Sequence, residues 1–184
     1  EVLIQSLAES GAMELILTGG EPSLHPRFFE ILRYACSQIP RIMLQSNGTL
    51  FADANFSNQL LQYPIFCLNF SLHGPETIHD RLTGVEGSFK QTIEAINFVT
   101  SSNIRLACNM VLTSYNSTPQ SIKETVRLLQ KLNVKEMTVT RFIPCGIGQQ
   151  SQNLIVTSSK LIEALEILKT ETSECKISLL LANA

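Results

Sequence analysis

Short apolar runs alternate along the chain with amphipathic stretches of about ten to fifteen residues, which is typical of βα units that build a parallel sheet. The apolar runs predict strands near residues 13–18, 42–46, 65–71, 104–112, 137–142 and 176–181. The stretches between them predict helices near residues 1–9, 26–38, 55–62, 89–101, 121–132 and 158–170. No stretch reads as a linker between domains.

Polar side chains occupy one face of several predicted strands, because successive side chains of a strand point to opposite faces. In the third strand, Phe66, Leu68 and Phe70 share one face. Asn69 and Ser71 lie on the other face, and the fourth strand repeats this division. A sheet covered by helices on both faces would be apolar on both, whereas the lumen of a barrel tolerates polar groups near a ligand. The pattern predicts a partial, open parallel βα barrel that is TIM-barrel-like.

Composition narrows the class of partner. The 184 residues suffice for one domain with a sizeable core, which we take to span 1–184. Charged residues are dispersed and sum to a formal net charge of -2, which argues against a nucleic-acid partner. The apolar runs are far too short for a membrane span. Five cysteines without CxxC spacing predict reduced, mostly buried thiols, a cytoplasmic protein and no locally held metal. A small-molecule or peptide partner is expected.

The sharpest chemical feature follows the first predicted strand, where the sequence reads Thr18-Gly19-Gly20-Glu21-Pro22. Two glycines let a ligand approach the backbone, Glu21 supplies an anionic acceptor and Pro22 stiffens the turn. This combination suits the ammonium group of a ligand. A Gly-Gly pair taken alone more often marks a tight turn between a strand and a helix, so both interpretations stay open at this point.

Further segments extend this signal in order along the chain. Residues 17–22 with Leu-His-Pro at 24–26 resemble the GGEP segment of the radical S-adenosylmethionine (radical SAM) superfamily. The Gln-Ser-Asn-Gly-Thr segment at 45–49 is similar to the TNG-type end of the following strand in that family. Ser-Leu-His-Gly at 71–74, with His-Asp at 79–80, resembles its S-L-D-G and H-D segments. Residues 141–148 resemble the end of its sixth strand in peptide-modifying and haem-related members.

The resemblance implies a 4Fe-4S cluster that cleaves S-adenosyl-L-methionine reductively to a 5′-deoxyadenosyl radical, which abstracts hydrogen from a substrate. It leans toward the SPASM-like subgroup, which implies a peptide or tetrapyrrole substrate and a reductant such as flavodoxin or ferredoxin. By this resemblance, Gly19, Gly20 and Glu21 bind the methionine amino group and Ser71 binds the ribose hydroxyls. The other expected cofactor contacts are Pro22, Gln45, Asn47 and Ile143.

Two departures from the family pattern matter. The CxxxCxxC motif that holds the cluster should precede the first helix, but Glu1 already begins that helix. We therefore expect the first strand and the cluster loop upstream of residue 1, and the chain alone to be inactive and to bind no stoichiometric iron. Thr83 stands where relatives often have arginine, which leaves the role of Arg81 open.

Two alternatives remain at this stage. One is a metal-dependent βα-barrel hydrolase or aldolase that uses Glu21 and His73, and the other is a non-catalytic barrel-like binding module. His73 is as readily a ligand as a structural residue. Capping or surface roles are expected for His25 and His79, which are interpreted as lying beside helix starts. Ion pairs are expected for Arg105 and Arg141, and Cys145 is expected to be inert.

Overall fold

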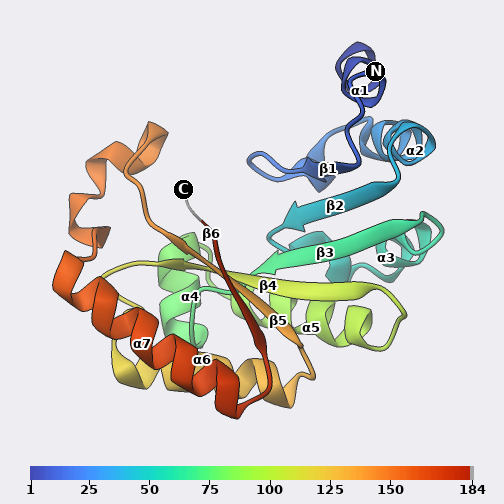
Figure 1. The fold of residues 1–184 in the computed structure, drawn as a ribbon. Coiled ribbons are helices and arrows are strands. Elements are labelled where there is room, and N and C mark those ends of the chain that lie inside the picture. Colours follow the sequence, from blue (N-terminus) through green and yellow to red (C-terminus); the bar gives the residue numbers. More distant parts are fainter. Residues whose placement is uncertain (183–184) are drawn as a thin grey trace. The chain divides into compact units, whose positions relative to one another are not determined.

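The computed structural model describes residues 1–182, in which helices and strands alternate along the chain (Figure 1). The strands are β1 (Glu14–Leu17), β2 (Arg41–Ser46), β3 (Ile65–Ser71), β4 (Arg105–Leu112), β5 (Glu136–Arg141) and β6 (Ser178–Ala182). The α-helices are α1 (Val2–Glu9), α2 (Phe28–Gln38), α3 (Ala54–Leu60), α4 (Glu76–Thr83), α5 (Ser88–Thr100), α6 (Pro119–Lys131) and α7 (Ser158–Glu174). Short 3₁₀ helices are η1 (Pro22–Leu24), η2 (Thr49–Ala52), η3 (Gly146–Gln150) and η4 (Gln152–Leu154).

The strands are ordered β1-β2-β3-β4-β5-β6 in the sheet. The ladders β1–β2, β2–β3, β4–β5 and β5–β6 are all parallel. Every strand predicted from the apolar runs is present within a few residues of its expected bounds. The parallel βα order predicted from the sequence is therefore confirmed.

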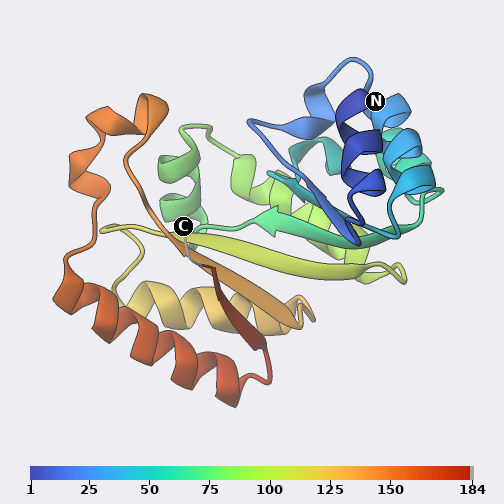
Figure 2. The same ribbon diagram turned by 45° about the horizontal axis from the view of Figure 1, so that its top comes forward.

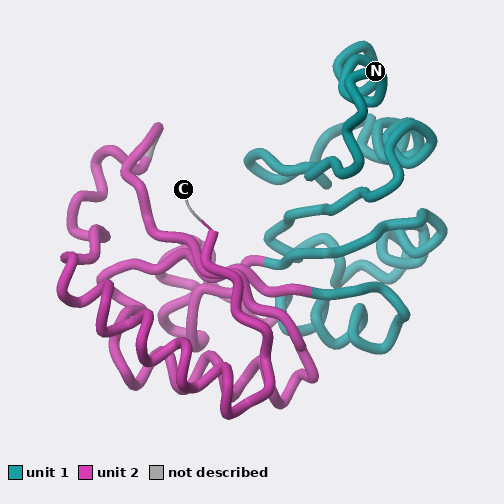
Figure 3. The backbone as a smooth tube through the Cα atoms, viewed as in Figure 1, with its two compact units in different colours: residues 1–70, 91–106 teal, residues 71–90, 107–184 magenta. Residues whose placement is uncertain are grey.

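The chain divides into two compact units (Figure 3). Unit 1 consists of Glu1–Phe70 with Gln91–Leu106, and unit 2 consists of Ser71–Lys90 with Ala107–Ala184. Unit 1 thus contains β1, β2 and nearly all of β3, whereas unit 2 contains most of β4 together with β5 and β6.

In unit 1, the apolar face of the strands packs against helices. Leu44 pairs in register with Leu68, and both side chains are fully buried. Phe70 continues this face and makes an edge-on contact with Phe51 of η2, with ring centroids 4.7 Å apart. Gln45 pairs with Asn69, and both are only half-buried because they lie on the opposite face. The predicted separation of polar and apolar faces is confirmed for these strands.

In unit 2, α6 and α7 lie side by side against the strands (Figures 1 and 2). The Thr118 hydroxyl caps α6 by accepting a hydrogen bond from the Ser121 backbone N–H at 3.3 Å, and Pro119 occupies the first turn. Ile122, Val126 and other residues at helical spacing are then fully buried. This capped, strongly amphipathic sequence explains why α6 begins where the sequence predicts.

Two local features differ from the prediction. Phe66 was assigned to the apolar face of the third strand, but the β2–β3 register shifts at this point and leaves Phe66 as an extra residue. Its half-buried ring lies beneath the guanidinium groups of Arg41 and Arg105, 5.5 and 5.3 Å from its centroid. The second difference is α4, which was not predicted and contains His79 as a buried residue rather than at a helix start.

Candidate functional site

The Gly-Gly turn at the carboxyl end of β1 presents bare backbone. Gly19 has a φ of +144°, a conformation that residues with a side chain rarely adopt. A methyl group added at Gly19 or Gly20 would meet no atom within 4 Å, and both residues are exposed. The backbone groups of this turn are therefore accessible to a ligand in unit 1.

The Glu21 carboxylate accepts hydrogen bonds from η1 and from the end of β2. Its Oε1 accepts from the Ser23 backbone N–H at 3.2 Å, the Ser23 hydroxyl at 2.5 Å and the Ser46 hydroxyl at 2.9 Å. Its Oε2 accepts from the Asn47 backbone N–H at 2.7 Å. Glu21 thereby caps η1, which begins at Pro22, and connects the loop after β1 to the end of β2.

These contacts determine how many further hydrogen bonds the Glu21 carboxylate can accept from a ligand. An ionised carboxylate offers about four lone-pair sites, and here Oε1 accepts three hydrogen bonds while Oε2 accepts one. Only Oε2 retains free capacity to accept from a ligand. Sequence reasoning did not identify Ser23 or Ser46 as partners of Glu21, although Ser46 lies inside the segment 45–49 and Ser23 follows Pro22 directly.

The other predicted contacts at β2 have mainly local partners. The Asn47 Oδ1 accepts from the Thr49 backbone N–H and hydroxyl, both at 2.9 Å, and so forms the turn into η2. Its backbone carbonyl accepts from the Thr92 hydroxyl at 3.0 Å. The Thr18 hydroxyl lies 3.5 Å from the Gln45 Oε1, a long hydrogen bond between the ends of β1 and β2. Of the Asn47 and Gln45 side chains, that of Gln45 is therefore the more available to a ligand.

Asn69 provides an unsatisfied acceptor on the same face as Gln45. Its Oδ1 is buried and has no hydrogen-bond partner within residues 1–182. Burying such an oxygen without a donor costs about 1 to 3 kcal/mol, so a ligand that donates a hydrogen bond here would remove a penalty. This acceptor and the bare Gly-Gly backbone fit a polar ligand such as S-adenosylmethionine at unit 1.

Ser71 and His73 lie where β3 ends, in unit 2. The chain stays paired with β4 past Ser71, because the Leu72 backbone N–H donates to the Asn109 carbonyl at 2.9 Å. Ser71 is half-buried at the last position of β3. The Asn109 Oδ1 is a second buried acceptor without a partner in the described chain. Unit 2 thus carries its own set of polar groups at the ends of β3 and β4.

His73 and His79 form a stacked pair, with ring centroids 5.6 Å apart and planes 21° apart. The His73 backbone N–H donates to His79 Nδ1 at 3.2 Å, and the Val111 backbone N–H donates to His73 Nδ1 at 3.3 Å. Burial, together with the neighbouring His79, lowers the pKa of His73 from 6.5 to about 4. Burial also lowers the pKa of His79, although Asp80 opposes this shift. Both rings are therefore neutral near pH 7.

Asp80 caps α5. Its carboxylate accepts from the Phe89 backbone N–H at 2.8 Å, the Gly87 backbone N–H at 2.7 Å and the Ser88 hydroxyl at 3.0 Å. These hydrogen bonds hold the pKa of Asp80 below its usual value. The Thr83 hydroxyl contacts Ser88 at 2.8 Å, so Thr83 belongs to the same cap.

Arg81 instead places its guanidinium over the Tyr115 ring, 3.9 Å from the centroid. The Tyr115 hydroxyl in turn accepts from Asn153 Nδ2 at 2.8 Å.

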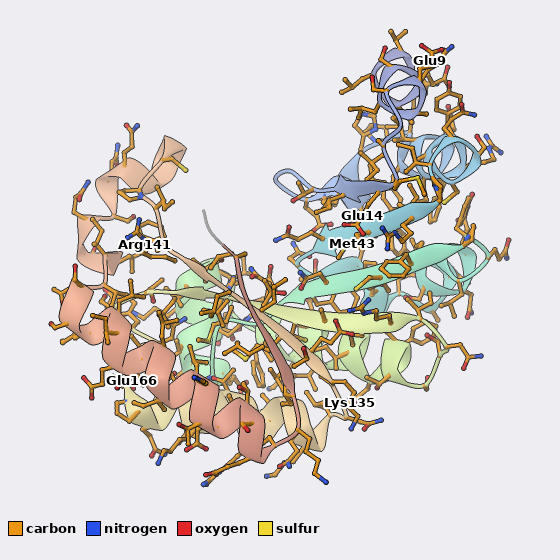
Figure 4. The ribbon with its side chains drawn as sticks, viewed as in Figure 1. Glu9, Glu14, Met43, Lys135, Arg141 and Glu166 are labelled. Atoms are coloured by element: carbon orange, nitrogen blue, oxygen red, sulfur yellow. The ribbon has the colours of Figure 1, made fainter. Side chains whose placement is uncertain are left out.

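Arg141 ends β5, and Ile143 lies in the segment that follows. The Phe142 backbone N–H donates to the Leu112 carbonyl at 3.0 Å, and the exposed Ile143 follows. Figure 4 shows Lys135 and Arg141 at the two ends of β5. Arg141 lines a pocket with Leu161 of α7 and makes no ion pair with any described residue, so the expected pairing of this residue is wrong.

Arg105 contacts the Phe66 ring, as described above, and also has a further interaction partner. Cys145 is exposed.

A larger apolar groove of about 610 Å³ lies elsewhere in unit 2. Ile162 and Leu165 of α7 and Leu179 and Leu181 of β6 line it. It contains none of the residues expected to bind a cofactor. Its size alone gives no reason to treat it as the functional site, because convergent polar groups distinguish such a site.

Residues 1–182 contain no group of three or more His, Cys, Asp or Glu side chains placed to hold a metal ion. The five cysteines are all free thiols, of which Cys67 and Cys108 are buried. Residues 1–182 also contain no helix long and apolar enough to cross a bilayer.

Comparison with known proteins assigns the class. Residues 2–129 match the Radical SAM superfamily, and the chain belongs to that superfamily. Among curated relatives, the AdoMet-dependent heme synthase of Oleidesulfovibrio alaskensis is 27% identical over 166 residues, covering 90% of the chain and 42% of the relative. The sporulation killing factor maturation protein SkfB of Bacillus subtilis is 29% identical over 117 residues, covering 63% of the chain and 28% of the relative.

Solved structures establish the fold. SuiB of Streptococcus suis bound to S-adenosylmethionine superposes with a TM-score of 0.78 at 16% identity, over 100% of the chain and 40% of SuiB. Coproporphyrinogen III oxidase (HemN) of Escherichia coli gives a TM-score of 0.70 at 12% identity, over 94% of the chain and 43% of HemN. The predicted open α/β partial barrel is confirmed. The chain spans less than half the length of the relatives named here.

Proposed function

We propose that this chain is the central part of the barrel of an enzyme that cleaves S-adenosylmethionine reductively and abstracts hydrogen from a substrate. The family match over residues 2–129 carries the proposal. The Gly-Gly-Glu-Pro turn at the carboxyl end of β1 supports it, because barrel enzymes bind their ligands at that end of the strands. The family match favours this function over a metal-dependent hydrolase or a non-catalytic binding module.

In unit 1, the exposed backbone of Gly19 and Gly20 would receive the methionine amino group, and Pro22 and Glu21 would hold the turn in shape. Gln45 and Asn47 would contribute neighbouring contacts. In unit 2, Ser71 would bind the ribose hydroxyls and Ile143 would contact the cofactor. When bound, a reduced 4Fe-4S cluster would supply the electron that cleaves S-adenosylmethionine to methionine and a 5′-deoxyadenosyl radical, and we place the CxxxCxxC ligands upstream of residue 1.

We infer that the substrate is a tetrapyrrole. Three of the relatives are named AdoMet-dependent heme synthase, and a further one is named Fe-coproporphyrin III synthase. A peptide substrate is the second candidate, because relatives include SkfB and a structure of SuiB bound to its precursor peptide SuiA. The electron donor would be a flavodoxin or ferredoxin. We propose a cytoplasmic protein with no nucleic-acid or membrane partner.

The test uses protein expressed from the complete reading frame that encodes this chain. After anaerobic reconstitution with iron and sulfide, the protein is reduced and incubated with S-adenosylmethionine. Release of 5′-deoxyadenosine, with about four irons per chain and a dependence on three cysteines spaced CxxxCxxC, is the expected result. A complete reading frame without that motif would instead favour the non-catalytic binding module.

The substrate class is tested separately with iron coproporphyrin III and with candidate peptides. A tetrapyrrole substrate should raise the rate of 5′-deoxyadenosine release above the rate without substrate. Stimulation by a peptide and not by the porphyrin would show that the substrate is a peptide rather than a tetrapyrrole.

A further inference from the structure

Three of the four polar groups of His73 are engaged by neighbouring residues of unit 2. Its backbone N–H donates to His79 Nδ1 at 3.2 Å, and its carbonyl accepts from Asn116 Nδ2 at 2.7 Å. Its ring Nδ1 accepts from the Val111 backbone N–H at 3.3 Å. The His73 ring nitrogen therefore accepts a hydrogen bond from a backbone N–H of β4, as a backbone carbonyl does in a sheet. It does so at the point where the chain turns away from β4, at the buried Gly74.

These contacts determine where the ring carries its proton. A neutral imidazole has one N–H and one acceptor nitrogen, and here Nδ1 accepts. The proton is therefore on Nε2, and no described residue accepts a hydrogen bond from it. The ring cannot swing freely to find a partner, because it is stacked on the buried His79.

Asn116 fixes the surrounding loop. Its side chain is fully buried and donates to both the His73 and the Val111 carbonyls, at 2.7 and 2.8 Å. Its Oδ1 accepts from the Thr113 backbone N–H at 2.6 Å and from the Thr113 hydroxyl at 3.1 Å. The Nε2–H of His73 is thus a donor held on a rigid support, and such a group binds an acceptor at little entropic cost.

We propose that His73 is a substrate-binding residue whose Nε2–H donates a hydrogen bond to a carboxylate of a tetrapyrrole substrate. This inference rests on the function proposed above. His73 follows Ser71 by two residues on the same side of the strand, about 7 Å farther toward the carboxyl end. It would therefore contact a molecule bound beyond the ribose site rather than the ribose itself.

The surrounding charges are compatible with a carboxylate ligand. The Asp80 carboxylate already accepts three hydrogen bonds from the start of α5, and Glu76 is paired with Lys90 at 3.6 Å. Arg81 is held over the ring of Tyr115, the residue before Asn116, and makes no ion pair with the described residues. The carboxylates of Asp80 and Glu76 are thus already engaged, and Arg81 has no carboxylate partner among the described residues.

Two substitutions separate this role from a purely structural one. His73→Asn keeps an acceptor near the position of Nδ1 for the Val111 N–H but removes the Nε2–H donor. His73→Gln places an amide N–H near the position of Nε2 but loses the acceptor for Val111. The probe is free-base coproporphyrin III, which has several carboxylates and no iron that histidine could ligate. Its fluorescence is titrated with reconstituted wild-type and variant proteins, and the methyl ester of the porphyrin serves as the ligand without carboxylates.

We expect His73→Asn to bind the porphyrin about tenfold to a hundredfold more weakly than wild type, as for loss of a hydrogen bond to a charged group. The melting temperature of this variant should stay close to that of wild type. His73→Gln should bind within about threefold of wild type, and the ester should bind all three proteins equally weakly.

The inference is overturned if His73→Asn binds like wild type, if both variants lose affinity equally, or if wild type binds the ester as well as the acid. Failure of wild type to bind the porphyrin also overturns it. None of these results affects the proposed cleavage of S-adenosylmethionine if the protein still releases 5′-deoxyadenosine without substrate, although failure of wild type to bind the porphyrin would also count against a tetrapyrrole substrate.

Discussion

The Glu21 Oε2 accepts a hydrogen bond from the Asn47 backbone N–H at 2.7 Å, and this contact joins the loop after β1 to the loop after β2. The resemblance to the radical SAM family suggests that Glu21 contacts the ammonium group of the cofactor. In the structure, most of its acceptor capacity serves Ser23, Ser46 and Asn47. We therefore expect Glu21 to act on the cofactor largely by holding the Gly-Gly backbone in place.

Glu21→Ala should lower the free energy of unfolding by about 2 to 3 kcal/mol, because it leaves several part-buried donors without an acceptor. It should also weaken S-adenosylmethionine binding by about tenfold or more. Urea unfolding and equilibrium binding measure the two effects. Glu30→Ala is the matched control, since Glu30 makes only an exposed ion pair with Arg27 and its loss should change stability by less than about 1 kcal/mol. A Glu21 variant with unchanged stability would show that the carboxylate is not a structural clamp.

Substitutions at two serines distinguish a structural role from a role in ligand binding. Ser46 is buried, donates to Glu21 and accepts from the Gly48 backbone N–H at 3.0 Å, so Ser46→Ala should cost about 1 to 2 kcal/mol of stability. Ser71→Ala should leave stability within about 0.5 kcal/mol and weaken S-adenosylmethionine binding about twofold to tenfold. Thermal unfolding and equilibrium binding measured on both variants test this contrast. The reverse pattern would remove Ser71 from the proposed cofactor site.

Stability should depend on pH through His73. The unfolded chain has a histidine pKa near 6.5, whereas burial lowers the pKa of His73 to about 4. Between these values the unfolded state binds more protons, so stability rises with pH and is lost as the pH falls from about 6.5 toward 4. The loss from this residue is about 3 kcal/mol at most, and His79 adds to it in the same direction.

Urea unfolding at several pH values measures this dependence. His73→Asn should flatten the slope between pH 4 and 6.5. An unchanged slope in His73→Asn would mean that the pKa of His73 is not lowered in the folded protein.

The strands were predictable because each is a short apolar run bounded by turn residues, and the start of α6 because Thr118 and Pro119 are strong local signals. The extra residue at Phe66 was not predictable, because a register shift depends on the neighbouring strand β2. Helix α4 was missed for a different reason. Its buried residue is His79, and a polar ring stacked on His73 adds nothing to an apolar periodicity.

The cofactor contacts expected from the sequence stay a prediction, and the hydrogen bonds that the structure shows among these residues were not predicted. The resemblance to the radical SAM family assigned Glu21 and Asn47 to the cofactor. It could not show that they bind one another, because this contact joins residues 26 positions apart. The partners of His73 were missed in the same way, since Asn116 lies 43 residues farther along the chain. Long-range hydrogen bonds of this kind leave no periodic trace in the sequence.

Gly19 and Gly20 offer the most direct test of ligand approach, because they differ in backbone conformation but not in surrounding space. Gly19 has a φ of +144°, so Gly19→Ala should strain the turn and cost about 1 to 3 kcal/mol of stability. Gly20 has no such constraint, and an added methyl group would meet no atom within 4 Å. Gly20→Ala should therefore leave stability within about 0.5 kcal/mol of wild type.

We expect Gly20→Ala to change the affinity for S-adenosylmethionine although it leaves stability almost unchanged. If the methionine amino group contacts this backbone, the methyl group of Gly20→Ala stands in the approach of the ligand and should weaken S-adenosylmethionine binding by about tenfold or more. Isothermal titration on anaerobically reconstituted protein, with urea unfolding in parallel, measures both quantities. Unchanged affinity in a stable Gly20→Ala protein would mean that the ligand does not approach this backbone, and that the Gly-Gly pair serves only the turn.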